Sequence, residues 1–193
     1  MINSNDCQKM EDNELVALSI KDSQYFYCLM KRYEEKLVNY VRRFTYLSDD
    51  DIADVVQESF INTYQHLNDC DCSLKFSSWL YRIVHNQAIN FLKKNKQAIR
   101  FDIQDGDDEF VDWLIDKTDI EKDTIKLHFN DYIQAVLQKL KPEYKEVLVL
   151  KFFEDKDYRE ISDILQKPMG TVATLLSRAK IQFKKNYEKE NQN

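Results

Sequence analysis

The sequence from Tyr158 to Phe183, YREISDILQKPMGTVATLLSRAKIQF, decides the fold class of the C-terminal part of the chain. Apolar residues recur in it at helical spacing on both sides of a break at Lys167-Pro168-Met169. These positions are Ile161, Ile164 and Leu165, then Val172, Leu175 or Leu176, Ala179 and Phe183. A short helix, a tight break and a longer helix predict a helix-turn-helix, whose second helix enters a DNA major groove. An ordinary helical hairpin fits the same pattern.

Two more helices are expected directly before this stretch. An apolar stripe begins near Leu127, and Pro142 suits the first turn of the next helix, where its missing N–H costs nothing. The apolar positions are Tyr132, Val136, Leu137, Leu140, Tyr144, Val147, Leu148, Leu150 and Phe152. The sequence therefore predicts a small helical domain over residues 127–187, followed by a tail, 188–193.

The N-terminal part also shows amphipathic helices. The segment Tyr25 to Phe44 has one continuous apolar face, which predicts a long core helix. Ser48 is placed to cap the next helix, and the aspartates after it suit the positive end of the helix dipole. Its inward positions are Ile52, Val55, Val56, Phe60, Tyr64 and Leu67. Its outward face, which includes Asp54, Gln57, Glu58, Ile61 and Asn62, suits either solvent or a basic helical partner.

A third helix begins after the loop from Asn68 to Ser73. Its flank combines cations, amides and aromatic residues, which together suit a phosphate backbone and unpaired bases. An ordinary core tryptophan at Trp79 and a solvated basic helix end at Lys93 to Lys96 explain the same residues without DNA.

Composition limits the fold class. The 193 residues include only two glycines and two prolines, which argues for an all-α protein and against barrels, sandwiches and phosphate-binding glycine loops. No apolar run is long enough for a membrane span, and a cytoplasmic location is expected. The four cysteines (Cys7, Cys28, Cys70, Cys72) are too sparse for a disulfide framework, so reduced thiols are expected.

Acidic residues concentrate in the middle of the chain. Residues 102–123 hold ten acidic and two basic residues, whereas the remainder is nearly balanced. This stretch lacks a sustained helical stripe and is interpreted as a linker, 99–126. Its apolar residues at Phe110 and Trp113 to Ile115 suggest either docking on a neighbouring domain or insertion into a basic channel of a partner.

Four motifs together resemble the extracytoplasmic-function (ECF) sigma factors of bacterial RNA polymerase, over about residues 22 to 187. Each is weak alone, but their order and spacing are specific. They are DVVQESF from Asp54 to Phe60, FSSWLYRIVHN from Phe76 to Asn86, LKPEYKEVL from Leu140 to Leu148, and GTV from Gly170 with SRAK from Ser177. The resemblance implies two small helical domains joined by the acidic linker: sigma region 2 over 22–98, after an N-terminal extension 1–21, and sigma region 4 over 127–187.

The resemblance also implies a role for each surface. Contact with the clamp helices of core RNA polymerase would fall to Asp54, Gln57, Glu58 and Ile61. Contact with the minus-ten promoter element would fall to Cys72, Lys75, Phe76, Trp79, Arg82, Asn86, Asn90, Lys93 and Lys94. Contact with the minus-thirty-five element would fall to Arg159, Thr171, Val172, Ala173, Thr174, Ser177, Arg178 and Lys180.

Partners follow from the same resemblance. They are core polymerase through its clamp helices and flap region, promoter DNA, and an anti-sigma factor, which would provide the only contact with a membrane if it is itself membrane-bound. No cofactor, catalytic residue or metal is implied, and the chain is expected not to be an enzyme, because the polymerase makes the phosphodiester bonds. The linker is expected to approach the active centre and RNA exit channel, whose positive walls would attract it.

The chain departs from the family pattern in its second half. Many relatives have basic residues where this chain has Ala173 and Leu175, which predicts fewer phosphate contacts and more apolar contact with thymine methyl groups. Gln166 stands where glycine is usual, so a left-handed backbone is expected there at a cost of roughly 1 kcal/mol.

Other functions remain open from sequence. A helix-turn-helix regulator acting without polymerase would bind operators as a dimer, and a sigma-like adaptor would bind polymerase after losing its DNA surface. A zinc site of His66, Cys70 and Cys72, with His85 nearby, has suitable ligand types but lacks a second cysteine pair at typical spacing.

Overall fold

The computed structural model describes residues 7, 9–70, 75–94 and 133–190. All regular elements in these ranges are helical, which confirms the all-α prediction. The predicted linker 99–126 and Cys72 lie outside the described residues.

Four α-helices of the N-terminal domain lie within the described residues. These are α2 (Asp12–Lys21), α3 (Phe26–Phe44), α4 (Asp49–Gln65) and α5 (Phe76–Lys94), with short 3-10 turns at Ser23–Tyr25 and Leu67–Asp69. The predicted face of α3 is buried, apart from Met30, which is partly exposed. Ser48 caps α4 as expected, because its Oγ accepts a hydrogen bond from the Asp51 N–H at 3.2 Å.

Two features of this domain differ from the sequence-based prediction. Residues 12–21 of the expected N-terminal extension form α2, which buries Leu15 and Val16 in the core. Cys7 and Cys28 form a disulfide with their Cα atoms 5.2 Å apart, so the expectation of reduced thiols is wrong for this pair. The spacing of cysteines along the chain did not show that folding brings these two together.

The C-terminal domain contains the predicted helix-turn-helix. Residues 133–138 are helical, and α8 (Pro142–Leu148) continues into a π-helix, η3 (Val149–Phe153). Pro142 occupies the first turn of α8, as its sequence position predicts. Two helices follow, α9 (Tyr158–Leu165) and α10 (Met169–Glu190). The second helix is therefore longer than the stretch to Phe183 that the apolar pattern outlined.

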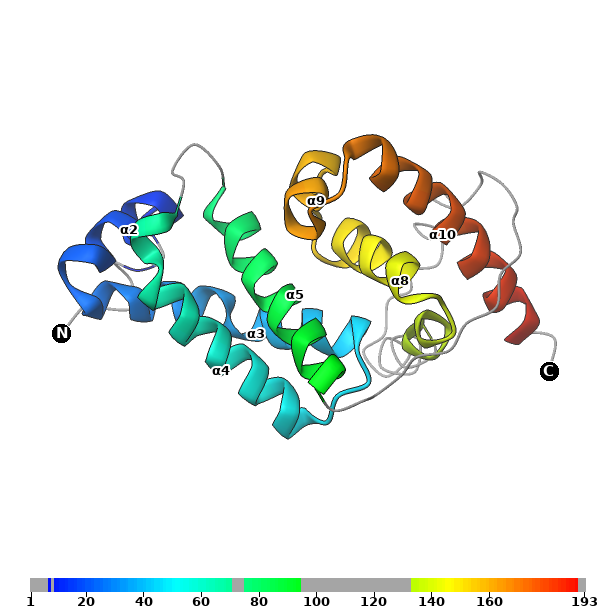
Figure 1. Cartoon of the computed structure of the whole chain (residues 1–193), viewed down its shortest axis with the longest axis horizontal. Coiled ribbons are helices and arrows are strands. Elements are labelled where there is room, and N and C mark those ends of the chain that lie inside the picture. The colour runs from blue at the N-terminus through cyan, green and yellow to red at the C-terminus, as the bar shows by residue number, and fades with distance from the viewer. Residues whose placement is uncertain (1–6, 8, 71–74, 95–132, 191–193) are drawn as a thin grey trace.

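The two domains contact each other directly. Helix α5 lies at the junction and packs along α9, while the C-terminal half of α3 approaches α8 and η3 (Figure 1). Figure 1 also shows α2 and the C-terminal end of α10 at opposite sides of the molecule. The buried apolar residues of both domains belong to one core cluster.

Candidate nucleic-acid and protein interfaces

The outward face of α4 presents the residues that the sequence assigned to it. Asp54, Gln57, Glu58 and Ile61 are all exposed, and their spacing of three and four residues aligns them on one side of the helix. Ile61 has 47% of its surface exposed. An isoleucine so exposed among carboxylates is typical of a protein-binding surface, where an apolar centre is surrounded by charge.

Grooves flank this face on both sides. One, with a volume of about 600 Å³, lies between α3 and α4 and is lined by apolar side chains that include Met30, Val38, Phe60 and Ile61. Tyr64, predicted to point inward, instead has 44% of its surface exposed at this groove.

The other groove is polar and lies between α4 and α5. Glu58 and Gln57 line it together with Lys94. The structure therefore places Lys94 beside the acidic α4 face, although the family resemblance implied a place for it on the minus-ten surface.

A polar stripe follows the outer side of α5. Asn86, Asn90 and Lys93 are exposed, and Arg82 and Trp79 are partly exposed. Trp79 packs against the core beside Phe76, with ring centroids 6.0 Å apart. Phe76 itself has only 1% of its surface exposed, so it supports the stripe from beneath rather than presenting a surface to a base.

The second helix of the helix-turn-helix exposes a short polar N-terminal surface. Thr171, Ala173, Thr174 and Arg178 are exposed, and Arg159 is exposed on α9. Ser177 and Lys180 are partly buried.

Two apolar residues of the predicted promoter-reading helix lie in the core instead. Val172 is fully buried and Leu175 has 8% of its surface exposed. The expectations that Val172 contacts DNA and that Leu175 meets a thymine methyl group are not supported by this placement. Both leucines, Leu175 and Leu176, are buried, although the spacing pattern required only one of them.

The turn between α9 and α10 has the expected backbone. Gln166 adopts a left-handed conformation with φ of 52°, where glycine is the usual residue. Ser162 stabilises the turn because its Oγ donates to the Lys167 carbonyl at 2.5 Å, and its own carbonyl accepts from the Lys167 N–H.

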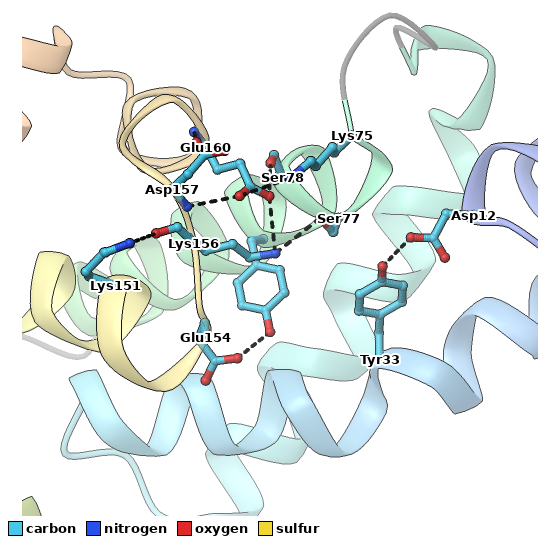
Figure 2. Close-up of polar contacts among 11 residues, drawn as sticks. Asp12, Tyr33, Lys75, Ser77, Ser78, Lys151, Glu154, Lys156, Asp157 and Glu160 are labelled. Atoms are coloured by element: carbon cyan, nitrogen blue, oxygen red, sulfur yellow. Dashed lines mark hydrogen bonds and ion pairs between the residues drawn. The ribbon is translucent and has the colours of Figure 1, made fainter. Parts of the chain in front are cut away.

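The domain interface contains charged side chains that the sequence did not single out (Figure 2). Glu160, on α9, pairs with Lys75 at 3.4 Å and with Lys156 at 3.7 Å. Lys156 donates to the Ser77 Oγ at 3.2 Å. Glu160 also completes a capping box with Asp157, so one side chain both starts α9 and joins it to α5.

A second set of polar contacts joins η3 to α3 and α5. Glu154 accepts a hydrogen bond from the Tyr81 hydroxyl at 2.6 Å and pairs with Arg43 at 3.2 Å. Burial raises the pKa of the Glu154 carboxyl, whereas Tyr81 and Arg43 act in the opposite direction. Lys156 lies over the Tyr81 ring at 4.6 Å.

Amide side chains of the C-terminal domain complete the interface. Gln134 donates to the Arg42 carbonyl at 2.9 Å, and Gln138 donates to the Thr45 carbonyl at 2.9 Å. The last carbonyls of a helix have no partner within it, and these amides from the other domain satisfy some of those of α3.

Three buried titratable groups lie beneath this interface. His85 bonds through Nδ1 to the Tyr40 hydroxyl at 3.0 Å, and its burial lowers its pKa to about 4. Burial lowers the pKa of Lys145 to about 8. Burial also raises the pKa of Glu146 to about 7, although Lys167 and Lys145 favour its ionised form.

The pKa of Glu146 predicts a dependence of stability on pH. Because folding raises this pKa from 4.5 to about 7, ionised Glu146 destabilises the folded chain. The resulting loss of unfolding free energy is absent below pH 4.5 and reaches about 3 kcal/mol above pH 7. Glu146→Gln should therefore match the wild type in unfolding free energy near pH 4.5 and exceed it by roughly that amount at pH 8.

Chemical denaturation at a series of pH values measures this difference, and Glu188→Gln is the matched control because Glu188 is an exposed glutamate on α10 of the same domain. If the difference in unfolding free energy between Glu146→Gln and the wild type stayed constant across this pH range, the prediction would be contradicted.

The residues considered for zinc are not gathered in the described part of the chain. His66 bonds to the Asn62 carbonyl through Nδ1, whereas His85 is buried beside Tyr40. Among the described residues no three His, Cys, Asp or Glu side chains are arranged to hold a metal ion.

Comparison with known proteins identifies the family. Residues 29–98 match the model of sigma-70 region 2, and residues 130–183 match that of sigma-70 region 4. The ECF RNA polymerase sigma factor SigW of Bacillus subtilis is 32% identical over 136 residues, 68% of this chain and 73% of that protein. The chain belongs to the ECF sigma factor family.

Other members align over almost their whole length. The ECF sigma-E factor of Haemophilus influenzae is 31% identical over 178 residues, 90% of this sigma factor and 93% of that one. This chain is therefore an alternative sigma factor that directs transcription.

Solved structures share the fold. The structure of CnrH in complex with the cytosolic domain of CnrY matches with a TM-score of 0.68 at 21% identity, covering 92% of this chain and 97% of that one. The sigma factor RpoE from Bartonella quintana, solved with the anti-sigma factor NepR, matches with a TM-score of 0.63 at 14% identity, covering 84% of this chain and 96% of that one.

Within the described residues, the helices of the sigma factor are too short or too polar to span a lipid bilayer.

Proposed function

We propose that the sigma factor binds core RNA polymerase through the α4 face and reads promoter DNA with two separate surfaces. The observation that carries this proposal is the exposure of Asp54, Gln57, Glu58 and Ile61 on one side of α4. An acidic face with an apolar centre complements a basic helical partner. The chain makes no covalent bond in this role, since the polymerase carries out the chemistry.

The α5 stripe is suited to the minus-ten element. Arg82 and Lys93 offer charge to phosphates, Asn86 and Asn90 offer amide groups to base edges, and Trp79 offers part of an aromatic face. The exposed N-terminal residues of α10 are suited to the minus-thirty-five element in a major groove.

The contact between the domains restricts promoter binding by the free chain. Lys75, at the start of the α5 stripe, is already paired with Glu160 of the C-terminal domain. Full engagement of the minus-ten surface therefore requires α9 to leave α5. Binding of both domains to core polymerase would supply the energy to separate them.

An anti-sigma factor is a second proposed partner. The groove between α3 and α4 is apolar, and its edge carries the exposed Ile61 and Tyr64. An amphipathic helix fits such a groove. A partner bound there would also cover the α4 face and block polymerase.

Binding of the full-length chain tests the proposed function and its two alternatives. Labelled chain is titrated with core polymerase, and the resulting complex is titrated with promoter DNA. A sigma factor gives a complex with core polymerase that binds promoter DNA more tightly than either component. Tight operator binding by the chain alone would favour the regulator, and polymerase binding without promoter binding would favour the adaptor.

Arg178 provides a test of the minus-thirty-five surface. Arg178→Ala should lower promoter affinity of the holoenzyme by about tenfold and reduce the salt slope by about one, because one phosphate contact is lost. Lys21→Ala is the control, since Lys21 is an exposed cation at the end of α2. Unchanged affinity and slope for Arg178→Ala would exclude Arg178 from the DNA surface.

A further inference from the structure

The disulfide joins the N-terminal segment to the middle of the core. Cys28 lies on α3 with 2% of its surface exposed, whereas Cys7 is partly exposed. The Arg32 guanidinium donates to the Cys7 carbonyl at 2.5 Å and to the Met10 carbonyl at 2.7 Å. The backbone at Cys7 and Met10 is thus held against α3 by a cation, and Cys7 is held by the disulfide as well.

A chain of contacts leads from this segment to α5. Arg32 pairs with Asp12 at 2.6 Å, and Asp12 accepts a hydrogen bond from the Tyr33 hydroxyl. Burial, together with Asp12, raises the pKa of Tyr33 well above its ordinary value, which keeps the hydroxyl protonated as a donor. The Tyr33 ring meets Phe76 edge-on at 5.9 Å.

The same contacts reach the domain interface. Ser77 lies next to the Tyr33 hydroxyl and accepts the hydrogen bond from Lys156. Figure 2 shows Asp12 and Tyr33 on one side of the first turn of α5, with Lys156 and Glu160 on the other. The N-terminal segment therefore supports the turn of α5 on which the C-terminal domain rests.

We propose that Cys7 and Cys28 form a thiol–disulfide switch that controls the order of α2 and of the first turn of α5. With the disulfide formed, Cys7 and residues 9–12 stay packed on α3, and Asp12 orients Tyr33. The first turn of α5 then stays helical. With both thiols free, the covalent link is lost, and the N-terminal segment is held by Arg32, by the Asp12–Tyr33 hydrogen bond and by the buried Leu15 and Val16. The start of α5 then opens more often.

The reaction balances with a glutathione-type disulfide as the oxidant. The Cys7 thiolate, the more accessible of the two, attacks one sulfur of the oxidant and releases one glutathione thiolate. The Cys28 thiolate then attacks the Cys7 sulfur and releases the second. Two protein thiols are oxidised to one disulfide, one oxidant disulfide is reduced to two glutathione thiols, and the two protons pass to those thiolates.

Hydrogen exchange on the full-length chain tests the switch. Cys70 and Cys72 are replaced by serine, so that Cys7 and Cys28 are the remaining cysteines, and the chain is equilibrated with oxidised or reduced glutathione. The matched control adds Cys7→Ser to the same background. Mass spectrometry reports the linked peptide, and amide exchange reports local opening.

The oxidised chain should yield the Cys7–Cys28 peptide, and its amides in α2 and in residues 76–79 should exchange at least tenfold more slowly than in the reduced chain. The C-terminal half of α10 should exchange equally in both states, and the control should not respond to glutathione. Absence of the linked peptide, or a linked peptide with unchanged exchange at the start of α5, would overturn the proposal. The free chain is used throughout, so this result does not depend on polymerase or promoter binding.

Discussion

Replacing Glu58 by lysine and Ile61 by glutamate together is expected to lower affinity for core polymerase at least 100-fold. The double variant reverses the charge at position 58 and replaces the apolar centre of the α4 face with a carboxylate. Loss of one partner of a charge pair that is buried and hydrogen-bonded in the complex typically costs about 2–5 kcal/mol. Both side chains are exposed, so the folded structure should be retained, with an unchanged helical circular dichroism spectrum.

The control applies the same two chemical changes elsewhere on the N-terminal domain. Glu35 is exposed on α3, and Ile20 on α2 has 49% of its surface exposed. The variant Glu35→Lys with Ile20→Glu should bind core polymerase like the wild type. An equal loss of polymerase affinity in both variants would attribute the effect to net charge or folding. Wild-type affinity of the Glu58→Lys, Ile61→Glu variant would exclude the α4 face as the polymerase-binding surface.

Removing the two interface carboxylates is expected to open the free chain. Glu154→Gln with Glu160→Gln preserves side-chain shape and leaves glutamine able to accept from the Asp157 N–H in the cap of α9. Arg43 and Lys75 then lose their carboxylate partners in the other domain. Breaking such partly buried pairs costs about 3 kcal/mol, which corresponds to a shift of roughly 100-fold toward the open arrangement.

Small-angle X-ray scattering measures the change as a larger radius of gyration. Glu34→Gln is the matched control, since Glu34 makes an exposed ion pair with Lys31 within α3. The control should scatter like the wild type. A scattering curve of the double variant that superposes on that of the wild type would show that these carboxylates do not hold the domains together.

Local sequence features predicted much of the fold. The apolar faces of α3 and α9 and the cap at Ser48 all depend on neighbours within a few residues, whereas the left-handed backbone at Gln166 was expected from the glycine that relatives usually have there. Periodicity and capping describe such neighbours well. The helix α2 was missed because its buried positions are few, and a short apolar stripe does not stand out among acidic residues.

The domain interface was not predicted because polar residues build it. Glu154, Lys156 and Glu160 resemble solvated side chains in the sequence, and only the tertiary structure gives them partners. The disulfide depends likewise on the position of residue 7 over α3. Val172 shows the opposite error, since a motif shared with relatives suggested a surface role for a residue that the helical period places in the core.

The most direct measurement of the central claim is transcription in vitro from a genomic promoter library, with core polymerase in the presence and absence of this chain. The account predicts new start sites that share two spaced elements, and predicts that Glu58→Lys with Ile61→Glu abolishes them. Start sites identical with and without the chain, under conditions in which it binds core polymerase, would contradict the account.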